Sequence, residues 1–63
     1  MYRVYMLTFE GHVLGFVDLQ CASDDEALKK AAALVGDDPV EVWNGGRRVG
    51  RFEADTVNRR SLH

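Results

Sequence analysis

The chain has 63 residues, eight basic and ten acidic side chains, a formal net charge of −2 and one cysteine. One domain of this size buries only about 60% of the surface that its unfolded chain exposes, so a monomer would be marginally stable. A single cysteine excludes an intrachain disulfide, and two histidines without a close partner do not supply the roughly four ligands of a structural zinc site. We therefore expect the chain to gain stability by association, as a homodimer.

The N-terminal part of the sequence predicts a β-hairpin. Residues 2–9 and 13–21 are rich in aromatic and β-branched residues, which favours strands. Gly11 marks the turn between them, and Gly15 predicts a bulge or a close backbone approach. Apolar residues alternate onto both faces of both strands. In the second strand this alternation separates two apolar groups, namely Val13, Val17, Leu19 and Cys21 on one face and Leu14 and Phe16 on the other.

Residues 23–36 predict the single helix. Ser23 is the expected N-cap, and Glu26 completes a capping box by reaching back to the Ser23 amide. Gly36 is expected to end the helix in the left-handed conformation. The apolar stripe is narrow and rich in alanine, so the helix can lie close to a sheet. It consists of Leu28, Ala31, Ala32 and Val35, with Ala27 and Leu34 beside it.

Residues 40–44 and 47–52 predict a second hairpin with two glycines at its tip. A three-residue loop over 44–46, with Gly46 left-handed, separates Val40, Val42, Gly50 and Phe52 from Glu41, Trp43, Val49 and Arg51. A two-residue loop instead separates Val40, Val42 and Val49 from Trp43, Arg48 and Phe52. We favour the three-residue loop because it collects Phe52 with both valines beneath the helix. Either loop directs Trp43 away from those valines.

The order of these elements predicts an α+β fold with the topology ββαββ. If the third strand lies beside the first, every neighbouring pair is antiparallel and the strand order is 2-1-3-4, with the helix across one face. We expect one domain over residues 1–53. Residues 54–63 lack periodicity and predict a flexible C-terminal tail.

One helix cannot cover both faces of a four-stranded sheet, and the uncovered face of this sheet is also apolar. Exposed apolar patches of this kind mark interaction surfaces. The sequence therefore predicts a small non-catalytic interaction module, a homodimer formed through the open sheet face, with an unidentified protein as a further potential partner. The candidate dimer contacts are Trp43, Tyr5, Leu7, Phe9, Phe16 and Val49.

The alternative function is nucleic-acid binding through the basic C-terminal hairpin. Residues 1–46 hold three basic and eight acidic side chains, whereas residues 47–63 hold five arginines and two acids. Arginines beside a tryptophan can bind the phosphates of a nucleic acid while the indole ring stacks on a base. The overall acidity, with a pI near 5.5, argues against strong non-specific binding. The candidate contacts are Arg47, Arg48, Arg51, Arg59 and Arg60.

We expect no enzymatic activity, no cofactor and no metal site. The sequence contains no grouping of nucleophile, base and orienting residue, and no glycine-rich loop before a helix. The acidic run at 24–26 is explained by favourable charge at a helix N-terminus. Cys21 is expected to be a small core residue. No segment resembles a signal peptide or a membrane span, so we expect a cytoplasmic protein without membrane association.

Three stretches carry a resemblance to a known group of proteins. The strand "YRVYMLT", the segment "VDLQCASDDEALKKAAAL" and the hairpin "VEVWNGGRRVGRF" resemble short uncharacterised proteins of alphaproteobacteria. This resemblance implies the ββαββ fold and no activity. A strand that ends in cysteine before a "DEA" helix is also similar to antitoxin domains of the HicB type. This resemblance implies that the alternative function, through the basic C-terminal hairpin, would be regulatory and antitoxin-like. The chain lacks the "PDLPGC" turn of these domains, having "VDLQC" at 17–21, and has no appended DNA-binding helices.

Overall fold

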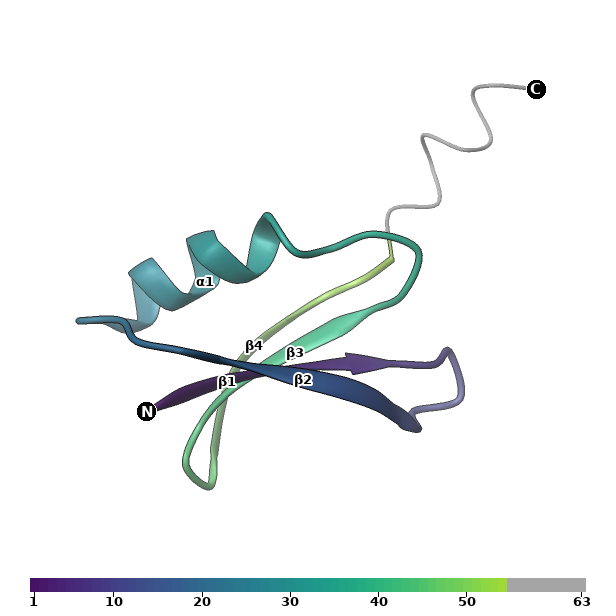
Figure 1. The fold of residues 1–63 in the computed structure, drawn as a ribbon, viewed down its shortest axis with the longest axis horizontal. Coiled ribbons are helices and arrows are strands. Elements are labelled where there is room, and N and C mark those ends of the chain that lie inside the picture. The colour runs from purple at the N-terminus through teal and green to yellow at the C-terminus, as the bar shows by residue number, and fades with distance from the viewer. Residues whose placement is uncertain (55–63) are drawn as a thin grey trace.

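The structure, a computed structural model, describes residues 1–54 as a four-stranded sheet with one helix (Figure 1). Neighbouring strands are antiparallel and follow the order β2-β1-β3-β4, which confirms the predicted α+β fold and its topology. The predicted tail lies outside the described residues except for Ala54. The elements are β1 (Tyr2–Leu7), β2 (Val13–Leu19), α1 (Asp24–Ala32), β3 (Val40–Asn44) and β4 (Arg47–Phe52).

The first hairpin turns earlier than the sequence predicts. Strand β1 ends at Leu7, and Thr8 begins a turn in which its carbonyl accepts a 2.9 Å hydrogen bond from the Gly11 amide. The Thr8 hydroxyl accepts a second bond, of 3.0 Å, from the His12 amide. Gly11 has a φ of 93°, a conformation that glycine adopts without strain. Phe9 therefore lies in the turn rather than in the strand.

The bulge expected near Gly15 is present in β2, one residue before it. Met6 pairs with Gly15 and Leu7 pairs with Val13, so Leu14 has no partner in β1. One extra residue reverses the alternation of side chains beyond it. The predicted grouping of Val13 with the helix-facing residues is therefore wrong, and Val13 lies on the face that carries Phe16.

Helix α1 begins at the predicted cap but ends sooner. The Ser23 hydroxyl accepts a 3.2 Å bond from the Glu26 amide, as predicted. The Glu26 carboxylate accepts its 2.7 Å bond from the amide of Ala22 rather than from that of Ser23. The helix ends at Ala32, and Gly36 does not adopt a positive φ, so its predicted capping role is wrong.

Tight turns replace the left-handed cap at the end of α1. The Leu34 amide donates to the Ala31 carbonyl at 2.9 Å, and the Val35 amide donates to the Ala32 carbonyl at 3.4 Å. Bonds between residues three apart occupy carbonyls that would otherwise lack partners at a helix end. A left-handed glycine is therefore not needed there.

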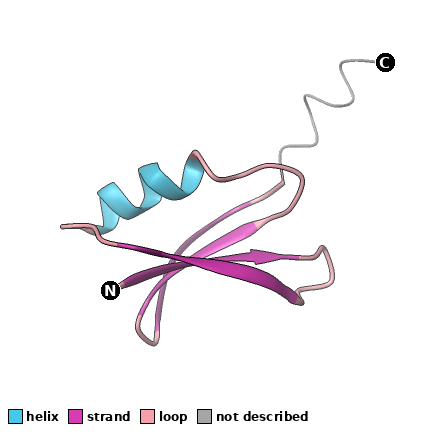
Figure 2. Cartoon of the chain, viewed as in Figure 1, coloured by secondary structure: helices cyan, strands magenta, loops and turns pink. Residues whose placement is uncertain are grey.

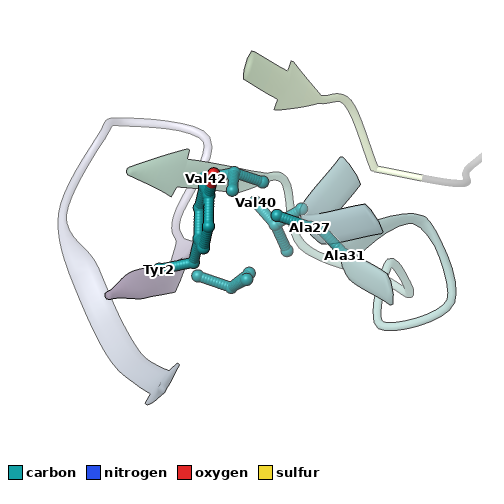
Figure 3. Close-up of a cluster of buried hydrophobic side chains, with 6 residues drawn as sticks. Tyr2, Ala27, Ala31, Val40 and Val42 are labelled. Atoms are coloured by element: carbon teal, nitrogen blue, oxygen red, sulfur yellow. The ribbon is translucent and has the colours of Figure 1, made fainter. Parts of the chain in front are cut away.

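The core lies between α1 and one face of the sheet. Figure 3 shows Ala27 and Ala31 of the helix beside Val40, within a cluster of buried apolar side chains. Ala27 rather than the predicted Ala32 shares this buried face, and Ala32 is exposed. The cluster consists of Tyr2, Val4, Ala27, Ala31, Val40 and Val42.

The small side chains of this core bring helix and sheet close together. A Cβ atom built on Gly50 would lie 2.8 Å from the Leu28 Cδ2 atom, so any larger residue at this position would require the Leu28 side chain to move. Among the described residues, the largest side chains with almost no exposure are three valines and Pro39. This is a thin core for a chain of 63 residues.

The second hairpin has a two-residue loop, so the preferred three-residue loop is wrong. Asn44 pairs with Arg47, and the turn consists of Gly45 and Gly46 (pink loops in Figure 2). Gly45 has a φ of 61°, whereas Gly46 has no positive φ. A positive φ at the first loop position alone is the pattern of a type II′ turn, which matches the twist of a hairpin.

A bulge in β4 restores the predicted grouping on the helix side. Val42 pairs with Gly50 and Trp43 pairs with Arg48, which leaves Val49 without a partner in β3. The predicted set of Val40, Val42, Gly50 and Phe52 therefore does share one face, although for a different reason. Val49 packs against the buried cluster, so its predicted position beside Trp43 is wrong.

Candidate interaction surface

The sheet face opposite α1 is uncovered in the described part of the chain. Figure 1 shows α1 on one side of the sheet, and none of the other described elements covers the opposite side. We call this side the open face. Strand register places on it the side chains of Arg3, Tyr5, Leu7, Val13, Phe16, Asp18, Glu41, Trp43 and Arg51.

A hollow of about 520 Å³ runs along β1 and β3 on the open face. Three of the predicted dimer contacts, Tyr5, Leu7 and Trp43, line it. Leu7 is 5% exposed although it does not belong to the buried cluster beneath α1. The complete lining consists of Tyr5, Leu7, Gly11, Val13, Glu41, Trp43, Gly45 and Arg51.

Glu41 organises the polar part of this hollow. Its Oε1 atom accepts a 3.1 Å bond from the Trp43 indole nitrogen, and its Oε2 atom accepts a 2.7 Å bond from Arg51. Arg48 approaches the same carboxylate at 3.7 Å. Burial raises the pKa of Glu41, but the bonds from Trp43 and Arg51 outweigh burial and hold that pKa below its usual range. Trp43 is thus fixed by a bond to its own strand.

A second cluster joins β1 to β2 on the open face. The Arg3 guanidinium donates to the Asp18 carboxylate at 2.7 Å and lies 3.9 Å from the centre of the Phe16 ring. Phe16 in turn lies 6.1 Å from the Tyr5 ring, centre to centre. The hydrogen bond from Arg3 lowers the pKa of Asp18 below its ordinary value. The charge at this end of β2 is therefore neutralised within the chain.

Exposed apolar side chains concentrate on β2. Seven large apolar residues are exposed in the described part of the chain, and four of them belong to this one strand. Strand β2 is an edge of the sheet, and α1 packs mainly over β3 and β4. The four are Val13, Leu14, Phe16 and Val17, with exposed fractions of 58, 59, 51 and 37%.

Sequence reasoning named Phe16 but not the other three residues as contacts. The sequence did contain a signal for these three residues. Apolar residues alternate onto both faces of β2, and this pattern indicates a strand that is buried on both faces. Strand order decides whether neighbouring elements can provide that burial. Here β2 lies at an edge, beyond the reach of most of the helix.

The other predicted contact residues are dispersed. Phe9 lies on the β1–β2 turn and is 71% exposed. Val49 packs against the buried cluster, as does the half-buried Cys21. The predicted dimer contacts are therefore brought together only in part, around Tyr5 and Trp43.

Three of the five arginines predicted to bind nucleic acid are described, and each of these three faces a carboxylate. Arg47 makes two 3.1 Å bonds to Asp24. Arg51 bonds both Glu41 and Glu53, the latter at 2.6 Å. Arg48 lies near Glu41 as well, and Arg59 and Arg60 lie outside the described residues. The described hairpin is consequently a network of ion pairs rather than an unopposed basic patch.

Two further properties of residues 1–54 bear on function. No group of three or more metal-ligating side chains forms among them. No helix in this part of the chain has the length and apolar character to span a membrane. Neither finding assigns an activity.

Comparison with known proteins does not assign an activity to this chain. No protein-family model, curated protein or solved structure matches this chain. The resemblances to short alphaproteobacterial proteins and to antitoxin domains of the HicB type therefore stay predictions. The exposed apolar surface of β2 and the hollow beside it are the features from which a function can be argued.

Proposed function

We propose that this chain is a non-catalytic interaction module that works as a homodimer. The observation that carries the proposal is the size of the core. Among the described residues, no side chain larger than valine or proline is fully buried, while four apolar side chains of one strand are half exposed or nearly so. Association would cover apolar surface that the single chain leaves in water.

The energetic argument follows from the cost of exposed apolar surface. Fully burying one valine, leucine or phenylalanine side chain contributes about 1.5–3 kcal/mol. A domain of this length has a net stability of only a few kcal/mol. Burial of even two such side chains between subunits would change that stability substantially. Folding and dimerisation should therefore be linked.

The absence of catalysis and the cytoplasmic location are parts of the same proposal. They rest on the residues rather than on the geometry of a site. The sequence offers no nucleophile with a base and an orienting group, and its one cysteine suits a reducing compartment.

The charge arrangement weighs against nucleic-acid binding as the main function. Each of the three described hairpin arginines would have to leave a carboxylate partner before it could bind a phosphate. Fluorescence anisotropy with short DNA and RNA at low and high salt tests this alternative. A salt-sensitive affinity that falls in the Arg47→Ala/Arg48→Ala variant would favour it over the dimer.

The homodimer itself is tested by measuring mass and stability together. Size-exclusion chromatography with light scattering should give twice the 7.1 kDa of the chain at tens of micromolar protein. The thermal midpoint should rise with protein concentration, because dissociation accompanies unfolding. A wild-type protein that is monomeric at tens of micromolar and has a concentration-independent midpoint would contradict the proposal.

A further inference from the structure

The two edges of the sheet differ in chemistry. Strand β4 carries Arg47, Arg48 and Arg51, and charged side chains are a common protection of exposed sheet edges. Strand β2 carries no arginine, lysine or proline. Its one charged residue, Asp18, is bonded to Arg3 of the neighbouring strand. The β2 edge is therefore the one on which a further strand can add.

Strand β2 also has a straight stretch long enough to pair. Residues 15–19 pair in unbroken register with residues 2–6 of β1, and the bulge is confined to Leu14. In an antiparallel ladder, every second residue of an edge strand directs its N–H and C=O groups away from its neighbour. These outward groups are ready to bond another strand.

Exposed residues on both faces of β2 favour a contact through the strand edge over a contact through one sheet face. Phe16 projects onto the open face and Val17 onto the face of the helix, yet both are exposed. A second sheet stacked on the open face would cover Phe16 and leave Val17 in water. A strand added beside β2 would bring neighbours to both residues.

We propose that two copies of the chain join edge to edge through β2, forming one continuous antiparallel sheet of eight strands. This inference rests on the proposed homodimer and specifies its contact. A second copy is the occupant because a two-fold axis beside β2 pairs the same edge of both subunits and closes the assembly. Because the core is thin, such a partner would add to the stability of each subunit.

Charge supports this symmetric pairing. When two copies of β2 run antiparallel, Asp18 meets the partner's Asp18 only if the symmetry axis passes through that residue. All other registers of the straight stretch place the carboxylate opposite an uncharged residue. Pairing of two β4 edges would instead bring two sets of three arginines together.

Amide hydrogen exchange on the wild-type protein tests the inference directly. The outward amides of β2 should exchange slowly at dimer-forming concentration and speed up on dilution. The outward amides of β4 serve as the internal control and should exchange quickly at both concentrations. If light scattering shows a dimer but the outward β2 amides exchange as fast as those of β4, the edge contact is wrong and the homodimer stands. A monomer would overturn both.

Substitution supplies a second test with a matched control. Val17→Lys places a lysine in the middle of the straight stretch of each subunit, and we expect it to weaken dimerisation at least tenfold. Phe9→Lys removes a more exposed apolar side chain from the turn and should leave dimerisation unchanged. Circular dichroism would confirm that both variants fold. Equal affinities of Val17→Lys and the wild type would overturn the edge contact.

The Trp43→Ala variant distinguishes a dimer contact through the β2 edge from a dimer contact through the open face. The edge contact does not include Trp43, so this variant should still dimerise. A monomeric, folded Trp43→Ala variant would show that the open face, as the sequence predicts, is the contact instead.

Discussion

Asp24 is the residue that ties the helix to the sheet. Its carboxylate accepts a 2.7 Å bond from the Tyr2 hydroxyl and two bonds from Arg47, so it joins α1 to β1 and β4. The bonds from Arg47 and then from Tyr2 hold the pKa of Asp24 below its ordinary value. The same bond to Asp24 is the main reason why the pKa of Tyr2 is raised. A residue expected to act through the helix dipole alone therefore also links three elements.

This network predicts a dependence of stability on pH. Since the folded pKa of Asp24 is lowered, its contribution is present above the unfolded value of about 3.9 and is lost as pH falls through the folded pKa. Asp24→Asn should lower the urea midpoint at pH 7 and make the loss of stability between pH 5 and 2 less steep. Urea titrations across this range measure both effects.

Asp25 provides the matched control for that experiment. It lies in the same first turn of α1 but bonds neither Tyr2 nor Arg47. Asp25→Asn removes a charge from the same turn without breaking the bonds to Tyr2 and Arg47, so it should lower the urea midpoint at pH 7 less than Asp24→Asn does. Identical acid profiles for Asp24→Asn and the wild type would show that the network contributes nothing to stability.

At the scale of elements, alanines determine how closely α1 approaches the sheet. Ala27 and Ala31 have no exposed surface, and the Gly50 backbone lies directly beneath Leu28. Close-packed interiors tolerate added volume poorly, because neighbouring groups must leave their preferred positions. The spacing of helix and sheet is thus a consequence of side-chain size.

Enlarging the buried alanine should therefore be more harmful than enlarging its neighbour. Ala31→Leu should destabilise the protein by about 1–3 kcal/mol through overpacking. Ala32→Leu, on the exposed side of α1, should change stability by no more than about 0.5 kcal/mol. Urea unfolding of both variants at one protein concentration measures the difference. Equal effects would mean that α1 does not pack as described.

The tip of the second hairpin gives another prediction at this scale. Gly45 has a positive φ and Gly46 does not, while a Cβ atom on either would meet no atom within 4 Å. Any difference between the effects of alanine at the two positions on stability should therefore come from backbone strain alone. Gly45→Ala should cost roughly 1–2 kcal/mol, and Gly46→Ala should be nearly neutral. The three-residue loop would require the reverse order, so thermal unfolding of the two variants tells the loops apart.

At the scale of the whole molecule, the sheet is covered asymmetrically. The helix lies mainly over β3 and β4, and most of the described ion pairs lie around Asp24 and Glu41. Most of the exposed large apolar side chains belong to β2. Exposed ion pairs contribute little to stability in water, so the arginine-rich edge mainly keeps that side of the sheet soluble. The apolar edge is left as the side on which association would bury most.

An association of this kind should depend little on salt. Burial of apolar side chains and strand pairing are not screened by ions, whereas contacts between exposed charges are. The dimer dissociation constant should change by less than about tenfold between 0.05 and 1 M sodium chloride. Sedimentation equilibrium at the two concentrations measures this, and a dimer that is lost at 1 M salt would point to a charged interface.

Local preferences in the sequence were enough to predict the elements, their order along the chain and the two hairpins. The strand order 2-1-3-4 was predicted only on the condition that the third strand lies beside the first, which is a contact between residues distant in the sequence. The alternating apolar residues of β1 and β2, the cap at Ser23 and the glycines between β3 and β4 each favour one structure whatever surrounds them. The position of Trp43 on the open face also followed from strand alternation. The hydrogen bond from the Trp43 indole to Glu41, within the same strand, holds the side chain on that face.

The exact position of each bulge, the residue at which the helix ends and the exposure of individual residues depend on tertiary contacts. The extra residues at Leu14 and Val49 depend on the fit between neighbouring strands, and each moves side chains to another face. The exposure of β2 depends on which strands the helix reaches. A local pattern states that a residue is apolar, but the elements packed around that residue determine whether it is buried, because burial is a property of neighbours that are distant in the sequence.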